Sequence, residues 1–497
     1  MDDTSADEYD VVVAGGGPGG STLAALVAKR GHRVLLLESE TLPRYQIGES
    51  LLPATVHGVC TLTGAAEEVA RAGFTRKMGG TFRWGAKPEP WTFSFSISPK
   101  MAGPTSFAYQ VERMKFDKIL LDNARKQGAA VREQCTVTSV LEEDGRVCGV
   151  SYQDPEGVAR QVRAKFVVDA SGHKSRIYRS VGGTREYSEF FRNIALFGYF
   201  ENAKRLPEPN SGNILSAAFD KGWFWYIPLS PTLTSVGAVV SPDLTNKIQG
   251  DPEEMFHALI PQCPIIADFL SGAKRVREGE YGKIRVRKDY SYRHTKFWRP
   301  GLVLTGDAAC FVDPVFSSGV HLATYSALLA ARSINSVLEN VLDEETVFTE
   351  FEARYRREFA VFYEFLVSFY EMHKDEDSYF WAARKVTKSD HTQLEAFVNL
   401  VGGVSSGEFH LDDPDALVRR VSTESAEFSD AINQQLDTGG SGNVVPMFKS
   451  ALVRQAMQES TQVQARAQLG KAFDGEAPAF PGGLISSPDG LLWQPSV

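Results

Sequence analysis

Residues Val11 to Glu38 read VVVAGGGPGGSTLAALVAKRGHRVLLLE. The β-branched run at the start of this stretch is typical of a strand that is buried on both faces. It is followed by Gly15, Gly17 and Gly20, which have the spacing G-x-G-x-x-G. In a strand–turn–helix unit the first glycine permits a tight turn, the second lets a pyrophosphate approach the backbone, and the third lets the helix pack closely. The stretch therefore predicts a dinucleotide-binding turn.

The rest of the stretch completes a strand–helix–strand unit. Ser21 to Lys29 is rich in helix formers, and its apolar spacing places on one face Leu23, Leu26 and Val27. A second strand, Val34 to Leu37, ends at Glu38, where a carboxylate can bond a ribose hydroxyl. An acid here argues against the 2′-phosphate of NADP and leaves FAD and NAD open. The alternative is a glycine turn with a structural role only, but the flanking elements all fit nucleotide binding.

The composition is that of an ordinary globular protein. Its 497 residues are 43% hydrophobic and 23% charged, and the formal net charge is −9. This length favours two to four domains, and the acidic balance argues against a general nucleic-acid or anionic-membrane binder. Five scattered cysteines without a C-x-x-C motif favour neither a disulfide framework nor a metal site. The acidic start lacks a signal-peptide pattern, and we expect no membrane span because the sequence contains no long apolar run. We therefore expect a cytoplasmic protein.

Further along the chain, residues 78–110 (GGTFRWG, WTFSFSIS) alternate in the manner of strands, and Arg113 to Gln127 has the pattern of an amphipathic helix. A hairpin is expected around Glu143-Asp144-Gly145. Residues 190–285 are mainly of strand type, with a short helix at PEEMFHALI. Helix is expected over 321–338 and over most of 344–400, whose many aromatic residues favour a core role over a channel lining. We see no internal repeat.

Two distant segments end strands with a carboxylate, like parts of one flavin site. They are Asp169-Ala170-Ser171-Gly172 and Gly306-Asp307. A carboxylate at a strand end can bond ribityl hydroxyls, although Asp307 alone is as compatible with a helix cap. In this order the segments resemble FAD-dependent monooxygenases of the hydroxybenzoate-hydroxylase fold. That resemblance implies FAD, contacted by Gly15, Gly17, Pro18, Gly20, Glu38, Ser50, Arg113, Asp169, Gly306 and Asp307.

Gly222 to Pro228 reads GWFWYIP. Its residues Trp223, Trp225, Ile227 and Pro228 match W-x-W-x-I-P, a motif of flavin-dependent halogenases. Alternating tryptophans on a strand often pack a core and do nothing more. Within the resemblance, these bulky residues, together with Pro314, separate substrate from flavin, so that the enzyme cannot act as a hydroxylase.

Lys77 lies in GFTRKMGGTFRWG, where the resemblance places the active-site lysine of these halogenases. A surface lysine is the ordinary alternative, and Arg76 is a competing basic residue that we rank lower. A lysine beside buried aromatic rings can hold hypohalous acid by a hydrogen bond or form a haloamine. Either role needs a nitrogen tuned by desolvation.

Phe311 to Gly319 reads FVDPVFSSG and resembles the F-x-x-P-x-x-S-x-G stretch of the same halogenases. Ser318 and Gly319 then match the positions whose backbone N–H groups hold halide beside the flavin. Backbone amides at a turn or helix start suit an anion. An ordinary Ser-Gly turn is the alternative reading of these two residues.

These resemblances imply an α/β fold in which a glutathione-reductase-like FAD domain is interleaved with a β-sheet substrate domain. We expect an FAD-binding module over residues 1–340, with substrate-sheet segments at about 80–110 and 190–285. A C-terminal helical region and tail would occupy 341–497. The stretch Phe369 to Arg384 is similar to the helical region of halogenases that act on phenolic and carrier-tethered substrates. The catalytic glutamate of tryptophan halogenases matches no position here, which argues against free tryptophan.

The function implied is an FADH2-dependent halogenase that uses O2 and a halide, with chloride favoured over bromide. Its substrate would be a phenolic ring in natural-product biosynthesis. No second nucleotide motif serves NAD(P)H, so the resemblance implies a separate flavin reductase as partner. The other partner is an aromatic small molecule or the acyl or peptidyl carrier protein that bears it. The alternatives are an FAD-dependent aromatic monooxygenase or related reductase on the same fold, and a carrier-binding module that keeps FAD only structurally.

Overall fold

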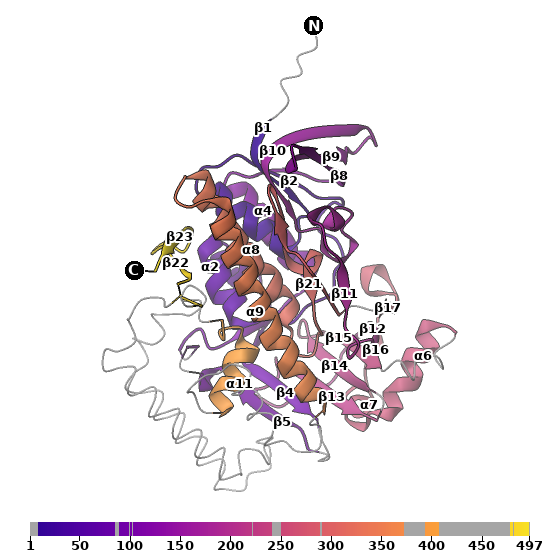
Figure 1. Cartoon of the computed structure of the whole chain (residues 1–497). Coiled ribbons are helices and arrows are strands. Elements are labelled where there is room, and N and C mark those ends of the chain that lie inside the picture. Colours follow the sequence, from indigo (N-terminus) through magenta and orange to yellow (C-terminus); the bar gives the residue numbers. More distant parts are fainter. Residues whose placement is uncertain are drawn as a thin grey trace.

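The structure is a computed structural model. It describes residues 8–84, 89–98, 100–101, 103–220, 222–240, 250–288, 291–371, 393–406, 478–480 and 482–496. Two large sheets, one above the other in Figure 1, organise these residues. The long helices α8 (Ser318–Leu338) and α9 (Glu344–Glu371) run alongside both sheets. The strands of the two sheets alternate along the chain, which agrees with the predicted interleaved arrangement. The domain division near residue 340 stays a prediction.

The first sheet is built around the opening stretch of the sequence. Its central strands are parallel, because β1 pairs with β2 on one side and β10 on the other, and β2 and β10 pair in turn with β7 and β20. Such a sheet needs cover on both faces, which explains the apolar runs of its strands. Its members are β1 (Glu8–Ala14), β2 (Val34–Leu37), β7 (Ala130–Arg132), β8 (Thr136–Glu143), β9 (Arg146–Gln153), β10 (Ala159–Asp169), β19 (Trp298–Arg299) and β20 (Leu302–Leu304).

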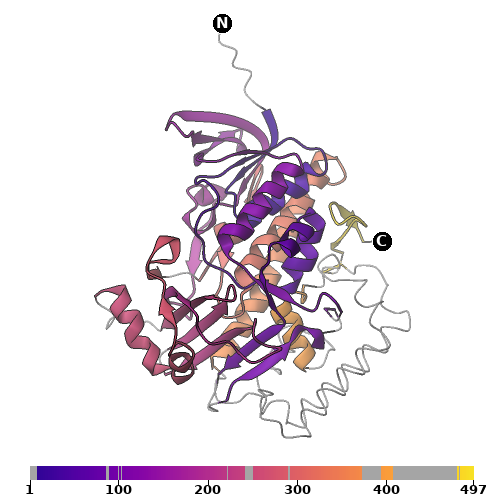
Figure 2. The same ribbon diagram turned by 180° about the vertical axis from the view of Figure 1, so that it is seen from behind.

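The predicted hairpin is confirmed: β8 and β9 join through Asp144 and Gly145, both with positive φ. Helix α1 (Pro18–Ala28) begins three residues earlier than expected and is buried on every side, not on one face. The reason is that α4 (Arg113–Lys126) and α8 pack around it. Figure 2 shows these helices together on one side of the sheet.

The second sheet has the order β16-β12-β15-β14-β13-β4-β5, with β17 beside β12. Its strands are β4 (Gly79–Arg83), β5 (Trp91–Ser94), β12 (Ile194–Glu201), β13 (Ile214–Phe219), β14 (Gly222–Pro228), β15 (Leu233–Val240), β16 (Lys274–Arg275) and β17 (Arg285–Lys288). The strand expected over FSIS is wrong: Phe95–Ile97 is a 3-10 turn, with the Ser94 hydroxyl accepting from the Ser96 N–H.

The second sheet is covered on both faces. One face packs on the main core, and the other packs on α6 (Pro252–Leu259), the predicted short helix, and α7 (Pro264–Phe269), which the sequence analysis missed. Two small sheets add further strands: β3 (Thr75–Lys77) pairs with β6 (Ala108–Gln110), and β18 (Tyr292–His294) lies between β11 (Arg185–Tyr187) and β21 (Cys310–Phe311). Further α-helices are α2 (Cys60–Thr63), α3 (Ala66–Arg71) and α11 (Gln393–Gly402). Further short helical turns are η1 (Ala54–Val59), η3 (Gly172–Lys174), η4 (Tyr178–Val181), η5 (Ile260–Gln262), η6 (Gly279–Tyr281) and η7 (Gly306–Ala308).

The aromatic residues of α9 are core, as expected, over the part of the helix that is described: Phe351, Phe362, Phe365 and Phe369 are fully buried. Residues 372–392, including most of the Phe369–Arg384 stretch, lie outside the described residues.

The Pro/Gly-rich tail also contributes a folded element. A hairpin is formed by β22 (Leu484–Ser486) and β23 (Trp493–Pro495). Its Trp493 ring packs against the guanidinium groups of Arg332 and Arg354, whose central carbons lie 4.5 and 4.8 Å from the ring centroid.

Candidate active site

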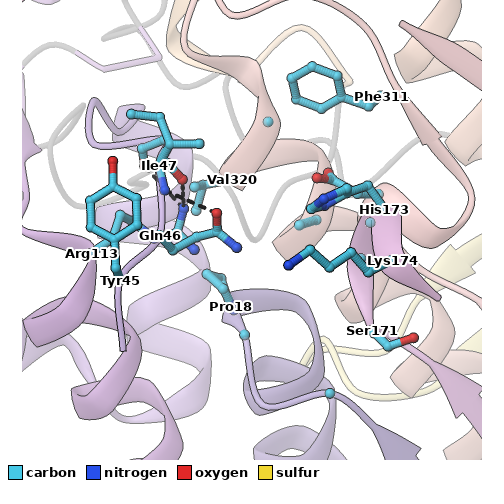
Figure 3. A pocket seen from close by; sticks show the side chains of 18 of the residues that line it. Pro18, Tyr45, Gln46, Ile47, Arg113, Ser171, His173, Lys174, Phe311 and Val320 are labelled. Atoms are coloured by element: carbon cyan, nitrogen blue, oxygen red, sulfur yellow. Dashed lines mark hydrogen bonds between the residues drawn. The ribbon is translucent and has the colours of Figure 1, made fainter. Parts of the chain in front are cut away.

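A cavity of about 1420 Å³ runs between the two sheets. Figure 3 shows its wall, to which widely separated parts of the chain contribute. The glycine turn forms one part of the wall, and the start of α8 forms another. The segment 43–50, the loop after β10, β17 and strand β14 complete it. A cavity of this size and extended lining suits a cofactor as long as a dinucleotide.

The glycine turn leaves room for a ligand at one position and is tightly packed at the others. A Cβ on Gly15 would lie 2.5 Å from the Ala170 carbonyl oxygen, and one on Gly20 would lie 1.9 Å from the Gly15 carbonyl oxygen. A Cβ on Gly17 would have only the Arg44 guanidinium within 4 Å, at 3.6 Å. Gly17 is the N-cap of α1 and no side chain caps this helix, so free backbone N–H groups face the open space. A pyrophosphate fits this arrangement.

Glu38 lies at the edge of this turn, as predicted. Its carboxylate is buried and lines the cavity. One oxygen accepts from the Gly16 N–H at 2.6 Å, and the other accepts from the Glu40 N–H at 2.9 Å. These bonds fix the carboxylate in place, and its remaining lone pairs can accept from a ribose.

Arg113 acts mainly on the segment that crosses the cavity. Its guanidinium pairs with Asp117 and donates to the carbonyl oxygens of Ile47, at 2.5 Å, and Gly48, at 3.3 Å. Gly48 has φ +98°, a conformation that favours glycine. Arg113 thus holds the segment that presents Ser50 to the cavity.

Asp169 does not itself lie on the cavity wall. Its buried carboxylate accepts from the N–H and hydroxyl of Ser171, at 3.1 and 2.5 Å, and from the Ser175 hydroxyl. We propose that Asp169 shapes the loop after β10, and that Ala170 and Ser171 of this loop contact the bound ligand. Asp307, with Gly306, does line the cavity. Burial raises the pKa of Asp307 to about 6, against the opposing charges of nearby arginines.

The W-x-W-x-I-P motif forms strand β14. Trp223, Trp225 and Ile227 share one face because side chains alternate along a strand, and Trp225 and Ile227 line the cavity. Trp223 does not line the cavity, and Pro228 belongs to the opposite face of the strand. A Cβ on Gly237 would lie 2.2 Å from the Trp225 ring, so this glycine makes room for the indole.

The predicted halide-binding residues lie in the first turn of α8, which begins at Ser318, three residues before the predicted start. The N-cap residue Ser317 has φ +61° and no capping side chain, and the Ser318 hydroxyl has no hydrogen-bond partner among the described residues. Gly319 and Pro314 line the cavity. An uncapped helix N-terminus at a cavity wall is a site for an anion.

Lys77 ends β3 and is 3% exposed. Its Nζ donates to the Ser50 hydroxyl at 2.9 Å and to the Leu51 carbonyl at 3.1 Å. Desolvation by burial lowers the pKa of Lys77 to about 7. Ser50 lines the cavity whereas Lys77 does not, so the serine stands between the lysine and the cofactor space.

The known protein family that matches this chain is described as tryptophan halogenase, over residues 10–102 and 96–428. The chain belongs to this family. It is 36% identical over 394 residues to the tryptophan 2-halogenase of Chondromyces crocatus, covering 78% of this chain and 72% of that protein. It is 31% identical over 389 residues to a 1H-pyrrole-2-carbonyl-[peptidyl-carrier protein] chlorinase of Pseudomonas fluorescens, covering 74% and 85%.

Among solved structures, the myxobacterial chondrochloren halogenase, a variant of FAD-dependent halogenases, is 50% identical with a TM-score of 0.74, covering 98% of this chain and all of that one. The protein is therefore a flavin-dependent halogenase, an oxidoreductase that uses FADH2 with halide and O2. This confirms the predicted family, fold and cofactor.

The halogenase cavity and the structure behind its wall also contain residues that the sequence analysis did not single out. Glu49 lines it with a buried carboxylate, accepts from the Tyr199 hydroxyl at 2.7 Å, and has its pKa raised by burial to about 7. Asp313, inside the FVDPVFSSG stretch, accepts from the Tyr370 hydroxyl, which in turn accepts from the Trp223 indole at 2.6 Å. Tyr370 comes from α9, so only the folded chain reveals this link.

The halogenase shows no cluster of three or more metal-ligating side chains within the residues that the structure describes. In the same residues no helix is long and apolar enough to cross a membrane.

Proposed function

We propose that this halogenase chlorinates an electron-rich phenolic ring, either free or carried by a carrier protein, in natural-product biosynthesis. Chlorination of such a ring is an electrophilic substitution, and a phenol is activated for it. The carrier-bound substrate of the Pseudomonas chlorinase supports a tethered aromatic ring, and the chondrochloren halogenase is similar over nearly the whole chain. Bromide is the alternative halide, and free tryptophan the alternative substrate.

The start of α8 is the proposed halide site. Backbone N–H groups of Ser318 and Gly319 lie in the uncapped first turn of a 21-residue helix, where the helix dipole favours an anion. Gly319 is on the cavity wall, so a chloride there would adjoin the cofactor. Trp225 and Ile227 also line the cavity, and in this proposal they keep the aromatic substrate away from the cofactor.

Lys77 is the proposed residue that carries the oxidised halogen to the ring. FAD, when bound and reduced, supplies with O2 the oxidising power that turns chloride into hypochlorous acid. With a pKa near 7, Lys77 is protonated in part and neutral in part. The ammonium form can donate a hydrogen bond to hypochlorous acid. The neutral amine can attack chlorine, so that an N–Cl bond forms as the Cl–O bond breaks, and the released hydroxide takes a proton from the nitrogen and leaves as water. The ring then takes the chlorine, and the proton that the ring loses restores the amine.

We further propose a separate flavin reductase as the source of FADH2 and the cytoplasm as the working compartment. All five cysteines are free thiols, which agrees with a reducing environment.

The single observation that carries the proposal is the contact of the buried Lys77 amine with Ser50 at the cavity wall. The test is a coupled assay with a flavin reductase, NADH, FAD, air and chloride or bromide. Substrates would include free phenols, carrier-bound phenols and free tryptophan, with products identified by mass spectrometry. We expect chlorinated phenol, and loss of that product in Lys77→Ala with FAD binding retained. Arg76→Ala serves as the matched control.

Three results would contradict the proposal. A hydroxylated product formed without halide would indicate a monooxygenase. Full chlorination by Lys77→Ala would remove the lysine from the mechanism. Chlorination of tryptophan in preference to every phenol would exclude the proposed substrate class.

A further inference from the structure

One part of the cavity wall is strongly basic although the chain as a whole is acidic, with a net charge of −9. We define the basic rim as Lys174, Lys283, Arg285, Arg287 and Lys288, all of which line the cavity. Lys174 belongs to η3 in the FAD domain, and the other four lie on β17 or just before it. The three lysines are exposed and the two arginines are partly buried, so the rim extends from solvent into the cavity.

The cations of the rim are only partly neutralised. Arg285 donates to the Glu280 carbonyl at 2.8 Å and lies over the Tyr45 ring at 3.5 Å, and its ion pair with the Glu280 carboxylate is long, at 3.4 Å. Arg287 contacts the His173 imidazole. For the three lysines of the rim the structure gives no ion pair within its described residues. Positive charge on one side of a cleft attracts an anion before contact.

Lys174 is itself exposed and lies near the glycine turn. The loop that carries it passes directly against this turn, since a Cβ on Gly15 would lie 2.5 Å from Ala170 and 2.8 Å from Ser171. Figure 3 shows the Lys174 side chain extending from η3 into the cavity, in the direction of Pro18 at the start of α1. An ammonium group and the free N–H groups of a helix start thus face the same space, the space into which a pyrophosphate fits.

We propose that the basic rim captures FADH2 from solution through its doubly charged pyrophosphate, and that Lys174 forms the ion pair that retains it. This rests on the proposed delivery of FADH2 by a separate reductase, because a cofactor that arrives by diffusion in each cycle needs fast association. Exposed charges act mainly on the association rate, whereas a charge that contacts the bound group acts mainly on dissociation. Lys283 and Lys288, on or just before β17, and Lys174, beside the glycine turn, therefore have separable roles.

The experiment is stopped-flow binding of oxidised FAD, followed by flavin fluorescence at several salt concentrations. For Lys283→Gln/Lys288→Gln we expect association about three- to tenfold slower at low salt, a weaker salt dependence and unchanged dissociation. For Lys174→Gln we expect dissociation about tenfold faster, restored in part by Lys174→Arg. Riboflavin, which has no phosphate, should bind all variants equally, and Lys126→Gln on α4 is the matched surface control.

Equal association of FAD to the double variant and the wild type at low salt would overturn the capture role. Unchanged dissociation from Lys174→Gln would overturn the ion pair. An equal loss of riboflavin binding would show that the substitutions change the cavity and not its charge, which also overturns the proposal. None of these readouts requires halogenation, so failure to chlorinate a phenol would refute the proposed function and leave this result standing.

Discussion

Replacing Lys77 with methionine should change how the stability of the protein depends on pH. Methionine fills a similar volume and cannot be protonated. In the unfolded chain Lys77 holds its proton up to its ordinary pKa of 10.5, whereas in the folded protein burial lowers that pKa to about 7. Between these two values the unfolded state binds more protons than the folded state. Raising the pH therefore stabilises the folded wild type relative to the variant.

The size of the effect follows from the two pKa values. At pH 7 the depressed pKa costs the folded wild type roughly 4 kcal/mol, and at pH 9 it costs about 2 kcal/mol. The free energy of unfolding of the wild type should thus gain about 2 kcal/mol over Lys77→Met between pH 7 and pH 9. Below about pH 6 the difference between the two proteins should be flat, because the amine is protonated in both states.

The assay is urea unfolding of both proteins at intervals from pH 6 to pH 9, with linear extrapolation to water. Lys126→Gln, an exposed lysine whose charge is lost from the surface of α4, is the control and should show no such trend. Parallel curves for the wild type and Lys77→Met would mean that the Lys77 pKa is ordinary. In that case the neutral amine could not be the species that accepts halogen at neutral pH.

Three further substitutions test other contacts. Trp493→Ala should destabilise the protein by about 3–5 kcal/mol in urea unfolding, because it empties a fully buried site beside two arginines; a loss below about 1 kcal/mol would mean that the hairpin does not pack as described. Gly237→Ala should displace the Trp225 indole and weaken FAD binding measured by fluorescence titration, while a mutant with wild-type affinity and tryptophan emission would refute the packing argument. Tyr370→Phe removes a donor to the buried Asp313 carboxylate and should cost about 1–3 kcal/mol of unfolding free energy, and an unchanged midpoint would show that this hydrogen bond is not formed in solution.

Local sequence patterns were sufficient to predict the parts of the fold that are formed by one continuous segment of the chain. The β1–α1–β2 unit, the β8–β9 hairpin and helix α4 could be predicted because their strand, turn and helix signals lie within a few residues of one another. The tail hairpin could not, because its stability comes from Trp493 inserting against α8 and α9, far away in the sequence.

The candidate site shows the same division. Lys77, Ser318 and Gly319 could be proposed from short motifs. A cofactor contact of Asp169 stays a prediction, and its position at a strand end does not reveal that Ser171 and Ser175 donate to its carboxylate. Most of the basic rim can be recognised in the sequence as four cations within the six residues KIRVRK (283–288). Their place at the cavity could not be predicted, because it depends on the pairing of β17 with β12.

Strand β14 also matters for engineering. Trp223, Trp225 and Ile227 pack toward the FAD domain, while Phe224 and Tyr226 on the other face pack toward α6 and α7. The strand thus belongs to two cores at once and has no solvent-facing position from Trp223 to Pro228. Random libraries aimed at this strand should yield mostly misfolded protein. A search for altered substrate range would sample productive variants more efficiently in the cavity-lining loops, where a new side chain meets space and not a second core.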